Sequence, residues 1–220
     1  MKMKTSLKSE MMCIGLVLLP FIYLAIVWTG LPAIVPIHWN AAGEIDGLRS
    51  KAILILIPFI LPFFIYVIFL LIQRFGPAEK LNKMGKKFAA LKFILILFTS
   101  ILAVFIIYSA SHGEVARPTF IFVLLGLLFT ALGNFFKTIQ PNYFLGIRTP
   151  WTLKHPSVWK STHELGGKMW FIGGLFIALI ALISTSLIAI ISMISILVII
   201  TFVPVVHSYL AAKKLKTSQS

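Results

Sequence analysis

Apolar residues in this 220-residue chain come in long segments that are separated by short polar stretches. An α-helix needs about 20 apolar residues to cross the hydrocarbon core of a bilayer. Residues 169–212 carry no formal charge, which is enough for two spans with a tight turn near Ser184–Ser192. The pattern predicts an all-α polytopic membrane protein, a single membrane domain over residues 1–220, with six transmembrane helices at 11–29, 52–73, 93–110, 119–136, 169–187 and 190–210.

Composition supports this class, because 59% of the residues are hydrophobic and only 12% are charged, whereas soluble domains are about 45–50% apolar. A net charge of +14 is also typical of nucleic-acid binding. Here the basic residues flank the apolar segments and form no soluble basic domain. We therefore expect no direct nucleic-acid binding.

The distribution of Lys and Arg predicts the orientation in the membrane. With six spans, 17 of these residues fall on the side of the two termini and 3 on the other side. Cytoplasmic loops carry the excess of Lys and Arg. Both termini and the long loop at 133–168, between the fourth and fifth helices, are therefore predicted to be cytoplasmic, and the polar loop at 30–51 is predicted to lie outside.

Few ionisable residues fall inside the predicted spans. His207 is the main candidate, near the end of the sixth span, and a snorkelling or capping role is expected for it. Coupled ion transporters usually keep a carboxylate or histidine within the membrane. The single cysteine, Cys13, excludes an intramolecular disulfide and suits a small buried apolar residue. Pro58 and Pro62 lie four residues apart and predict a kink that faces the bundle.

The cytoplasmic loop at 133–168 is longer than a connector needs to be, and it mixes polar groups with large aromatic residues. Pro156 suits the first position of a short helix, on which Trp159, Thr162 and His163 would share one face. Gly166–Gly167 would then break this helix or let another backbone come close. We expect a ligand or partner to bind at Asn134, Pro141, Asn142, Gly146, Arg148, Thr149, Trp151, Trp159, His163 and Gly167.

Two other interpretations of this loop stay open. It is also consistent with an interfacial re-entrant loop whose polar groups satisfy one another, or with the site of a transporter or intramembrane enzyme. The pair His163–Glu164 begins a metalloprotease pattern, but the second histidine would have to stand where Gly167 is found. We expect no catalytic residue and no enzymatic activity.

The outer loop at 30–51 is the second polar patch, with turn signals at Gly43 and Asp46–Gly47. His38, Glu44 and Asp46 are residue types that bind zinc or manganese. The alternative, which we favour, is that they hydrogen-bond one another and the loop backbone, with no metal and no cofactor. Ligand binding on this side is expected at His38, Trp39, Asn40, Gly43, Asp46 and Lys51.

Both patches resemble known sequence signatures. The run GN-x₆-PNYFLGIRTPWTL-x₄-VW-x₂-TH-x₂-GGK resembles that of the Sdp immunity-protein family of bacterial membrane proteins. The outer run PIHWNAAGEIDGLRSK is similar to a small module that commonly precedes it in that family. Together they cover residues of roughly 14–62 and 125–190.

The resemblance implies a non-enzymatic, multi-pass protein of the bacterial plasma membrane that protects the cell from a secreted toxic peptide. For the family's namesake it also implies signalling, in which a cytoplasmic repressor is held at the membrane. The expected partners are the toxic peptide, such a repressor and membrane lipids. A structural membrane protein without a ligand is a further alternative.

Overall fold

A computed structural model of the chain describes residues 6–40, 43–76, 84, 86–113, 118–139, 141 and 146–217. The chain divides into two compact units, Met1–Pro118 and Thr119–Ser220, called here the N-terminal unit and the C-terminal unit. The apolar pattern predicted a single membrane domain. A hydropathy pattern locates apolar helices, but it does not show which helices pack on which.

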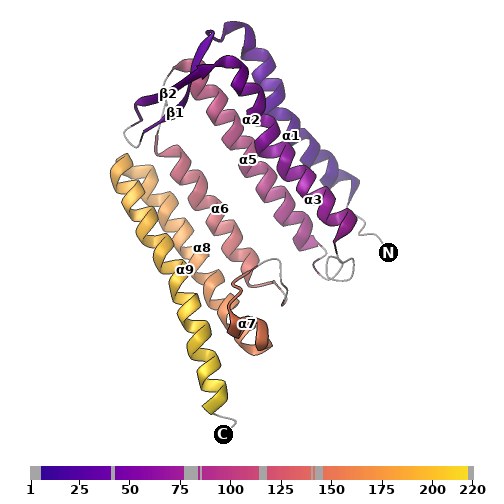
Figure 1. Cartoon of the computed structure of the whole chain (residues 1–220), viewed down its shortest axis with the longest axis vertical. Helices are drawn as coiled ribbons and strands as arrows, with labels where there is room; N and C mark the ends of the chain where they lie inside the picture. The colour runs from indigo at the N-terminus through magenta and orange to yellow at the C-terminus, as the bar shows by residue number, and fades with distance from the viewer. Residues whose placement is uncertain are drawn as a thin grey trace. The chain divides into compact units, whose positions relative to one another are not determined.

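The N-terminal unit is built on two long helices that pack side by side, α1 (Leu7–Val27) and α5 (Lys86–His112) (Figure 1). A third helical segment packs against them. It runs from Lys51 to Phe75 and includes α2 (Leu56–Pro58) and α3 (Phe64–Phe75).

The predicted effect of Pro58 and Pro62 appears between α2 and α3, where Phe59–Phe63 forms a π-helical turn. Both prolines are buried. A proline in a helix lacks the N–H that the ladder needs and crowds the carbonyl four residues before it. The wider turn accommodates both effects.

The outer loop contains a β-hairpin, so the prediction of an all-α fold is wrong at this position. Strand β1 (Ile34–Trp39) pairs antiparallel with β2 (Ile45–Ser50), and β1 also packs against α5. β-Branched residues in β1 favour an extended chain, and Gly43 supplies a positive φ of 88° at the turn. The register is irregular between Pro36 and Trp39, as in a β-bulge.

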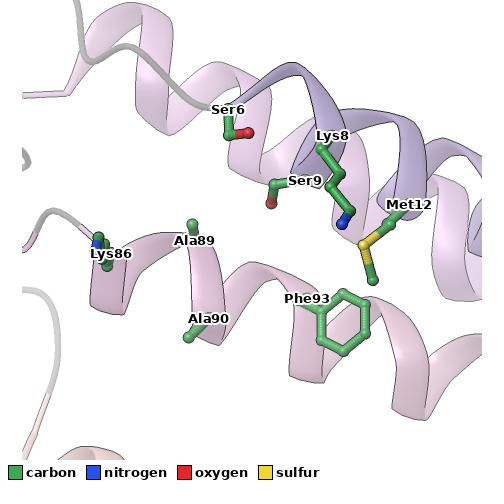
Figure 2. Close-up of a pocket in the computed structure, with 8 residues that line it drawn as sticks. All are labelled: Ser6, Lys8, Ser9, Met12, Lys86, Ala89, Ala90 and Phe93. Carbon is green, nitrogen blue, oxygen red and sulfur yellow. The ribbon is translucent and has the colours of Figure 1, made fainter.

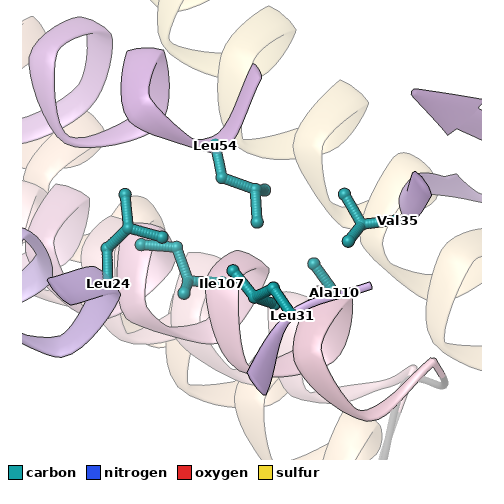
Figure 3. Packing of buried hydrophobic residues seen from close by; sticks show 6 residues of the cluster. All are labelled: Leu24, Leu31, Val35, Leu54, Ile107 and Ala110. Atoms are coloured by element: carbon teal, nitrogen blue, oxygen red, sulfur yellow. The ribbon is translucent and has the colours of Figure 1, made fainter. Parts of the chain in front are cut away.

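A buried apolar cluster joins the hairpin to the helices of this unit. Val35 from β1 and Leu54 from the following helical segment are both 0% exposed. Figure 3 shows their side chains beside residues of α1 and α5. The cluster consists of Leu24, Leu31, Val35, Leu54, Ile107 and Ala110. Burial of such side chains stabilises by about 1.5–3 kcal/mol each, so the hairpin is held by this core.

Over its described residues, the C-terminal unit contains three long helices and one short one: α6 (Phe120–Phe136), α7 (Pro150–Lys154), α8 (Pro156–Ile183) and α9 (Ser186–Thr217) (Figure 1). Pro156 does begin a helix, as predicted. That helix is α8 itself, which continues through Gly166–Gly167 to Ile183. The prediction of a short helix within the 133–168 loop, ended by a break at the two glycines, is therefore wrong in the extent of the helix.

Glycines instead let α6 and α8 approach at backbone distance. A Cβ added at Gly133 would lie 2.2 Å from the backbone nitrogen of Phe171, and one added at Gly126 would lie 2.5 Å from that of Ala178. On α8, a Cβ at Gly167 would lie 2.8 Å from the carbonyl oxygen of Gly133. The alternative expectation for this region, a close backbone approach, is thus the one that the structure supports. Small residues at such contacts are typical of helix pairs in membranes.

Within the residues that the structure describes, five helical segments are long and apolar enough to cross a membrane: Leu7–Gly30, Lys51–Phe75, Lys86–His112, Pro156–Ile183 and Ser186–Thr217. Helix α6, at the position of the predicted fourth span, is apolar but has only 17 residues. The count of six spans therefore stays a prediction, whereas a mostly helical fold with several helices long and apolar enough to span a membrane is confirmed. The last turn lies at Ser184–Thr185, at the start of the predicted range.

Candidate functional site

A group of side chains surrounds the start of α8 and forms the inner cluster. Its members come from the segment before α7, from α7 and α8, and from α9. They are Ile147, Thr149, Thr152, Trp159, His163 and Ser208. This cluster contains the site predicted from residues 133–168, and it lies entirely within the C-terminal unit.

His163 is the centre of the inner cluster and is 2% exposed. The backbone N–H of Ile147 donates to its Nε2 at 2.9 Å, so Nε2 holds a lone pair. The other ring nitrogen, Nδ1, then donates to the carbonyl oxygen of Trp159 at 2.9 Å. These bonds define a neutral ring with its proton on Nδ1. Because both ring nitrogens are hydrogen-bonded, His163 holds the backbone at Ile147 against α8.

Aromatic packing fixes the plane of the His163 ring. The Trp159 ring stacks on it with centroids 4.1 Å apart and an interplanar angle of 18°. The Trp159 indole N–H also donates to the carbonyl oxygen of Ile139 at 2.8 Å, which ties the end of the α6 region to α8. The predicted common face of Trp159, Thr162 and His163 is confirmed, since all three are buried on α8.

The absence of a side chain at Gly146 makes room for the hydrogen bond between Ile147 and His163. Its φ is +108°, and an added Cβ would lie 2.3 Å from Nε2 of His163. A side chain at this position would therefore be strained in the backbone and would occupy the place of the Ile147 hydrogen bond.

Two threonines and a serine form the other half of the inner cluster. Thr149 caps α7 in a capping box with Thr152, and Thr152 Oγ1 also donates to the carbonyl oxygen of Ile147 at 2.8 Å. Thr149 Oγ1 lies 3.0 Å from Ser208 Oγ on α9. The hydroxyl of Thr149 therefore links α7 to α9, and all three residues are buried.

Of the remaining residues predicted for the inner site, Gly167 is buried in the contact of α8 with α6, and the others that the structure describes are more exposed. Arg148, Asn134 and Pro141 are exposed, and Trp151 packs edge-to-face on Tyr209 at 5.1 Å. Asn142 lies outside the described residues. The structure thus gathers Gly146, Thr149, Trp159 and His163 in one place. It leaves Arg148 and the exposed positions of α7, such as Leu153 (37% exposed), on the surface around them.

Sequence reasoning missed Thr152 and Ser208. The spacing of Thr149 and Thr152 is that of an N-terminal capping pair, which was a usable signal. Ser208 gives no such signal, because its partner lies 59 residues away in the sequence.

The outer hairpin carries the second predicted site, and it lies in the N-terminal unit. His38 Nδ1 is hydrogen-bonded to Asp46 Oδ1 across the two strands, and these side chains are 70% and 43% exposed. At the turn, Asn40 Nδ2 donates to Glu44 Oε2 at 2.8 Å, and Asn40 Oδ1 accepts from the Glu44 N–H at 3.0 Å. Polar groups of the hairpin therefore hydrogen-bond one another.

Lys51 and the hairpin glycines are structural parts of this site. Lys51 Nζ donates to the carbonyl oxygens of Trp28 and Leu31, both at 3.2 Å, and lies 4.9 Å from the centre of the Trp28 ring. These contacts of Lys51, the residue after β2, connect the end of the hairpin to the chain that follows α1. Gly47 lies directly beneath His38, since an added Cβ would be 2.9 Å from the His38 Cβ.

Metal binding was the alternative considered for His38, Glu44 and Asp46. Over the part of the chain that the structure describes, no three His, Cys, Asp or Glu side chains come together in a group that could hold a metal ion.

A buried ion pair was not predicted. Lys92 Nζ on α5 lies 2.9 and 2.7 Å from the two carboxylate oxygens of Glu10 on α1. The side chains are 2% and 21% exposed. The Tyr66 hydroxyl of α3 donates to the same carboxylate at 3.3 Å, and the Lys92 ammonium lies 4.5 Å from the centre of the Tyr66 ring. The pair therefore joins three helices of the N-terminal unit.

Comparison with known proteins adds three findings. Residues 138–208 match the SdpI/YfhL protein family, and residues 15–61 match a domain of unknown function, DUF1648. The chain is 26% identical over 178 residues to the immunity protein SdpI of Bacillus subtilis (strain 168), which is 81% of this chain and 84% of that protein. No solved structure matches the chain. The range 15–61 holds the outer hairpin, and the range 138–208 holds the inner cluster.

Proposed function

We propose that this chain, which is similar to the SdpI/YfhL protein family and to the immunity protein SdpI, is a membrane immunity protein that protects the cell from a secreted toxic peptide. The similarity to an immunity protein carries this proposal. The 178 matched residues exceed the length of either unit, so both units take part in the match. The proposal therefore concerns the whole chain and both sites.

We place toxin recognition on the outer hairpin. Its polar groups, led by the His38–Asp46 pair, stand beside apolar side chains that are also exposed: Ile34 at 62%, Leu48 at 53% and Ile45 at 43%. A surface that offers apolar area and charged heads together suits an amphipathic peptide. A ligand that arrives from outside would meet this hairpin under the predicted topology.

The inner cluster would serve a second role, the presentation of a cytoplasmic surface to a repressor. Its buried hydrogen bonds hold the segment of Ile147 to Thr149 in one conformation. Arg148 is exposed at the centre of that segment, and its planar guanidinium suits a carboxylate on a partner. Since the hydroxyls of Thr149 and Ser208 connect the segment to α9, a shift of α9 would displace it.

Enzymatic activity at the inner cluster is less consistent with its geometry. A general base needs a free nitrogen within reach of its substrate. Both nitrogens of His163 are engaged by the protein's own backbone.

Survival of challenged cells tests the immunity proposal. A Bacillus subtilis 168 strain that lacks its SdpI would express this chain and grow in medium conditioned by the wild-type strain. We expect survival near that given by SdpI itself, and reduced survival for Asp46→Asn, which weakens the pair with His38. Survival equal to that of an empty vector, with the protein present in the membrane at normal level, would contradict the proposal for this toxic peptide.

Arg148→Lys tests the separate proposal about a repressor. Lysine keeps the positive charge but lacks the planar fork. Loss of one hydrogen bond to a charged partner costs roughly 1.5–3 kcal/mol, about a tenfold or larger fall in affinity. We expect weaker recruitment of a fluorescently labelled repressor to the membrane and unchanged survival. Lys154→Arg, an exposed site on α7, is the control. Unchanged recruitment by Arg148→Lys would remove Arg148 from the partner surface.

A further inference from the structure

A groove between α1 and α5 lies at the end of the N-terminal unit where both helices begin. Its volume is about 370 Å³, and it is lined by Ser6, Lys8, Ser9, Met12, Lys86, Ala89, Ala90 and Phe93. Figure 2 shows the Lys8, Ser9 and Met12 side chains directed from α1 toward the groove, with Phe93 on α5 opposite Met12.

The residues that line the groove form a polar group and an apolar group. Hydroxyls and ammonium groups come from Ser6, Lys8, Ser9 and Lys86, which all lie within the first turn of their helices or just before it. Met12 lies about one turn beyond Lys8 on α1, Phe93 lies about two turns beyond Lys86 on α5, and both are apolar. A ligand that fills the groove would therefore place a polar head near the helix starts and an apolar part further along them.

The charge of the groove is positive. Among the eight described residues that line it, two are lysines and none is acidic. Glu10 is adjacent in sequence, but both of its carboxylate oxygens accept from Lys92 on a neighbouring face of the helix pair. Lys92 thus compensates the negative charge of Glu10. The electrostatic potential in the groove is therefore set by the ammonium groups of Lys8 and Lys86.

We propose that this groove binds the phosphate head of an anionic phospholipid, with the start of an acyl chain along Met12 and Phe93. Basic pockets between transmembrane helices on the cytoplasmic side are suited to such heads, and the N-terminus and the 74–92 segment carry the charge that predicts this side. The lipid would bridge α1 and α5 at a point where the groove separates them. This proposal is independent of toxin immunity.

Native mass spectrometry of the full-length protein tests it, with phosphatidylglycerol and phosphatidylcholine supplied in equal amounts. We expect phosphatidylglycerol to bind preferentially and its apparent affinity to fall by about tenfold or more in Lys8→Gln/Lys86→Gln, since each surface lysine contributes about 1 kcal/mol to such attraction. The arginine pair, Lys8→Arg/Lys86→Arg, should retain binding and shows that loss is not a folding defect.

Lys87→Gln/Lys213→Gln is the matched control, because both lysines are exposed and lie outside the groove while the change in net charge is the same. An equal loss in this control would attribute binding to general surface charge and overturn the proposal. Equal binding of the two lipids, or no loss in the groove variant, would also overturn it. Full displacement of the lipid by inorganic phosphate would show a free-anion site and not a lipid site.

Discussion

The ion pair of Glu10 and Lys92 gives the most demanding test of the N-terminal unit. Glu10→Gln would leave the Lys92 ammonium, 2% exposed, without its anion. Lys92→Met would instead leave the Glu10 carboxylate, which is 21% exposed and keeps the Tyr66 hydroxyl. Breaking a buried pair by removing one partner costs about 3–5 kcal/mol. We expect the Glu10 variant to be the more destabilised, because the charge that it strands is the more deeply buried.

The double substitution separates the interaction free energy of the ion pair from the cost of leaving one buried charge without its partner. Replacing both partners of a buried pair by uncharged residues is often close to neutral. Glu10→Gln/Lys92→Met should therefore be more stable than at least one of its single variants, with a coupling of about 2 kcal/mol or more.

Cys13 supplies the assay. It is the protein's one cysteine, it is 1% exposed, and it lies one turn from Glu10 on α1. The rate at which a thiol reagent labels it reports the opening of this region. A loss of about 3 kcal/mol should raise that rate by roughly two orders of magnitude. Lys87→Met, an exposed lysine on α5, should label like the wild type. Equal rates in all variants would refute the claim that the pair holds the helices together.

Three further predictions concern the glycines and the topology. Gly146→Ala should destabilise the purified protein by about 1–3 kcal/mol in thermal unfolding, because the Cβ would collide with His163. Gly15→Ala is the control: it has open space around it and should be neutral or slightly stabilising. Equal effects of the two substitutions would show that the hydrogen bonds of His163 contribute nothing to stability. Gly174→Val should separate α6 from α8, since even a Cβ would lie 2.5 Å from the backbone nitrogen of Thr130, and a lower unfolding temperature checks this. A reporter fused after Lys154 should indicate the cytoplasm and one fused near Gly113 the outside, and the reverse pattern would place both sites on the wrong sides.

Local sequence signals predicted the parts of this protein that depend on neighbouring residues. Apolar runs located the long helices, Pro156 marked the start of α8, and the three-and-four spacing brought Trp159 and His163 to one face. The hairpin was missed because its strands are short and carry turn residues, so a polar loop looked equally consistent with residues 34–50. Its stability comes from contacts with α1 and α5, which no local pattern contains.

Long-range partners account for the remaining errors. Glu10 and Lys92 are 82 residues apart, and each stands at the edge of an apolar run, where a charge normally faces water or lipid heads. Nothing in either neighbourhood indicates that they face each other. The same holds for Gly133 and Gly167, whose backbones meet only because α6 and α8 pair. Glu10 and Lys92 were therefore assigned to the flanks of spans, and for Gly166–Gly167 the sequence left a helix break and a close backbone approach equally open, because the partners lie far away along the chain.

The glycine contacts of α6 and α8 also determine which genetic changes this protein can tolerate. Every amino acid that replaces glycine adds at least a Cβ. Any missense change in one of these codons therefore places an extra atom in the contact between the two helices. At Gly126, Gly133 and Gly174 the nearest obstacle is another backbone, which cannot rotate away as a side chain does. These positions therefore form a small mutational target within otherwise permissive lipid-facing helices. Their loss should be repaired most readily by reversion, and seldom by a second change elsewhere.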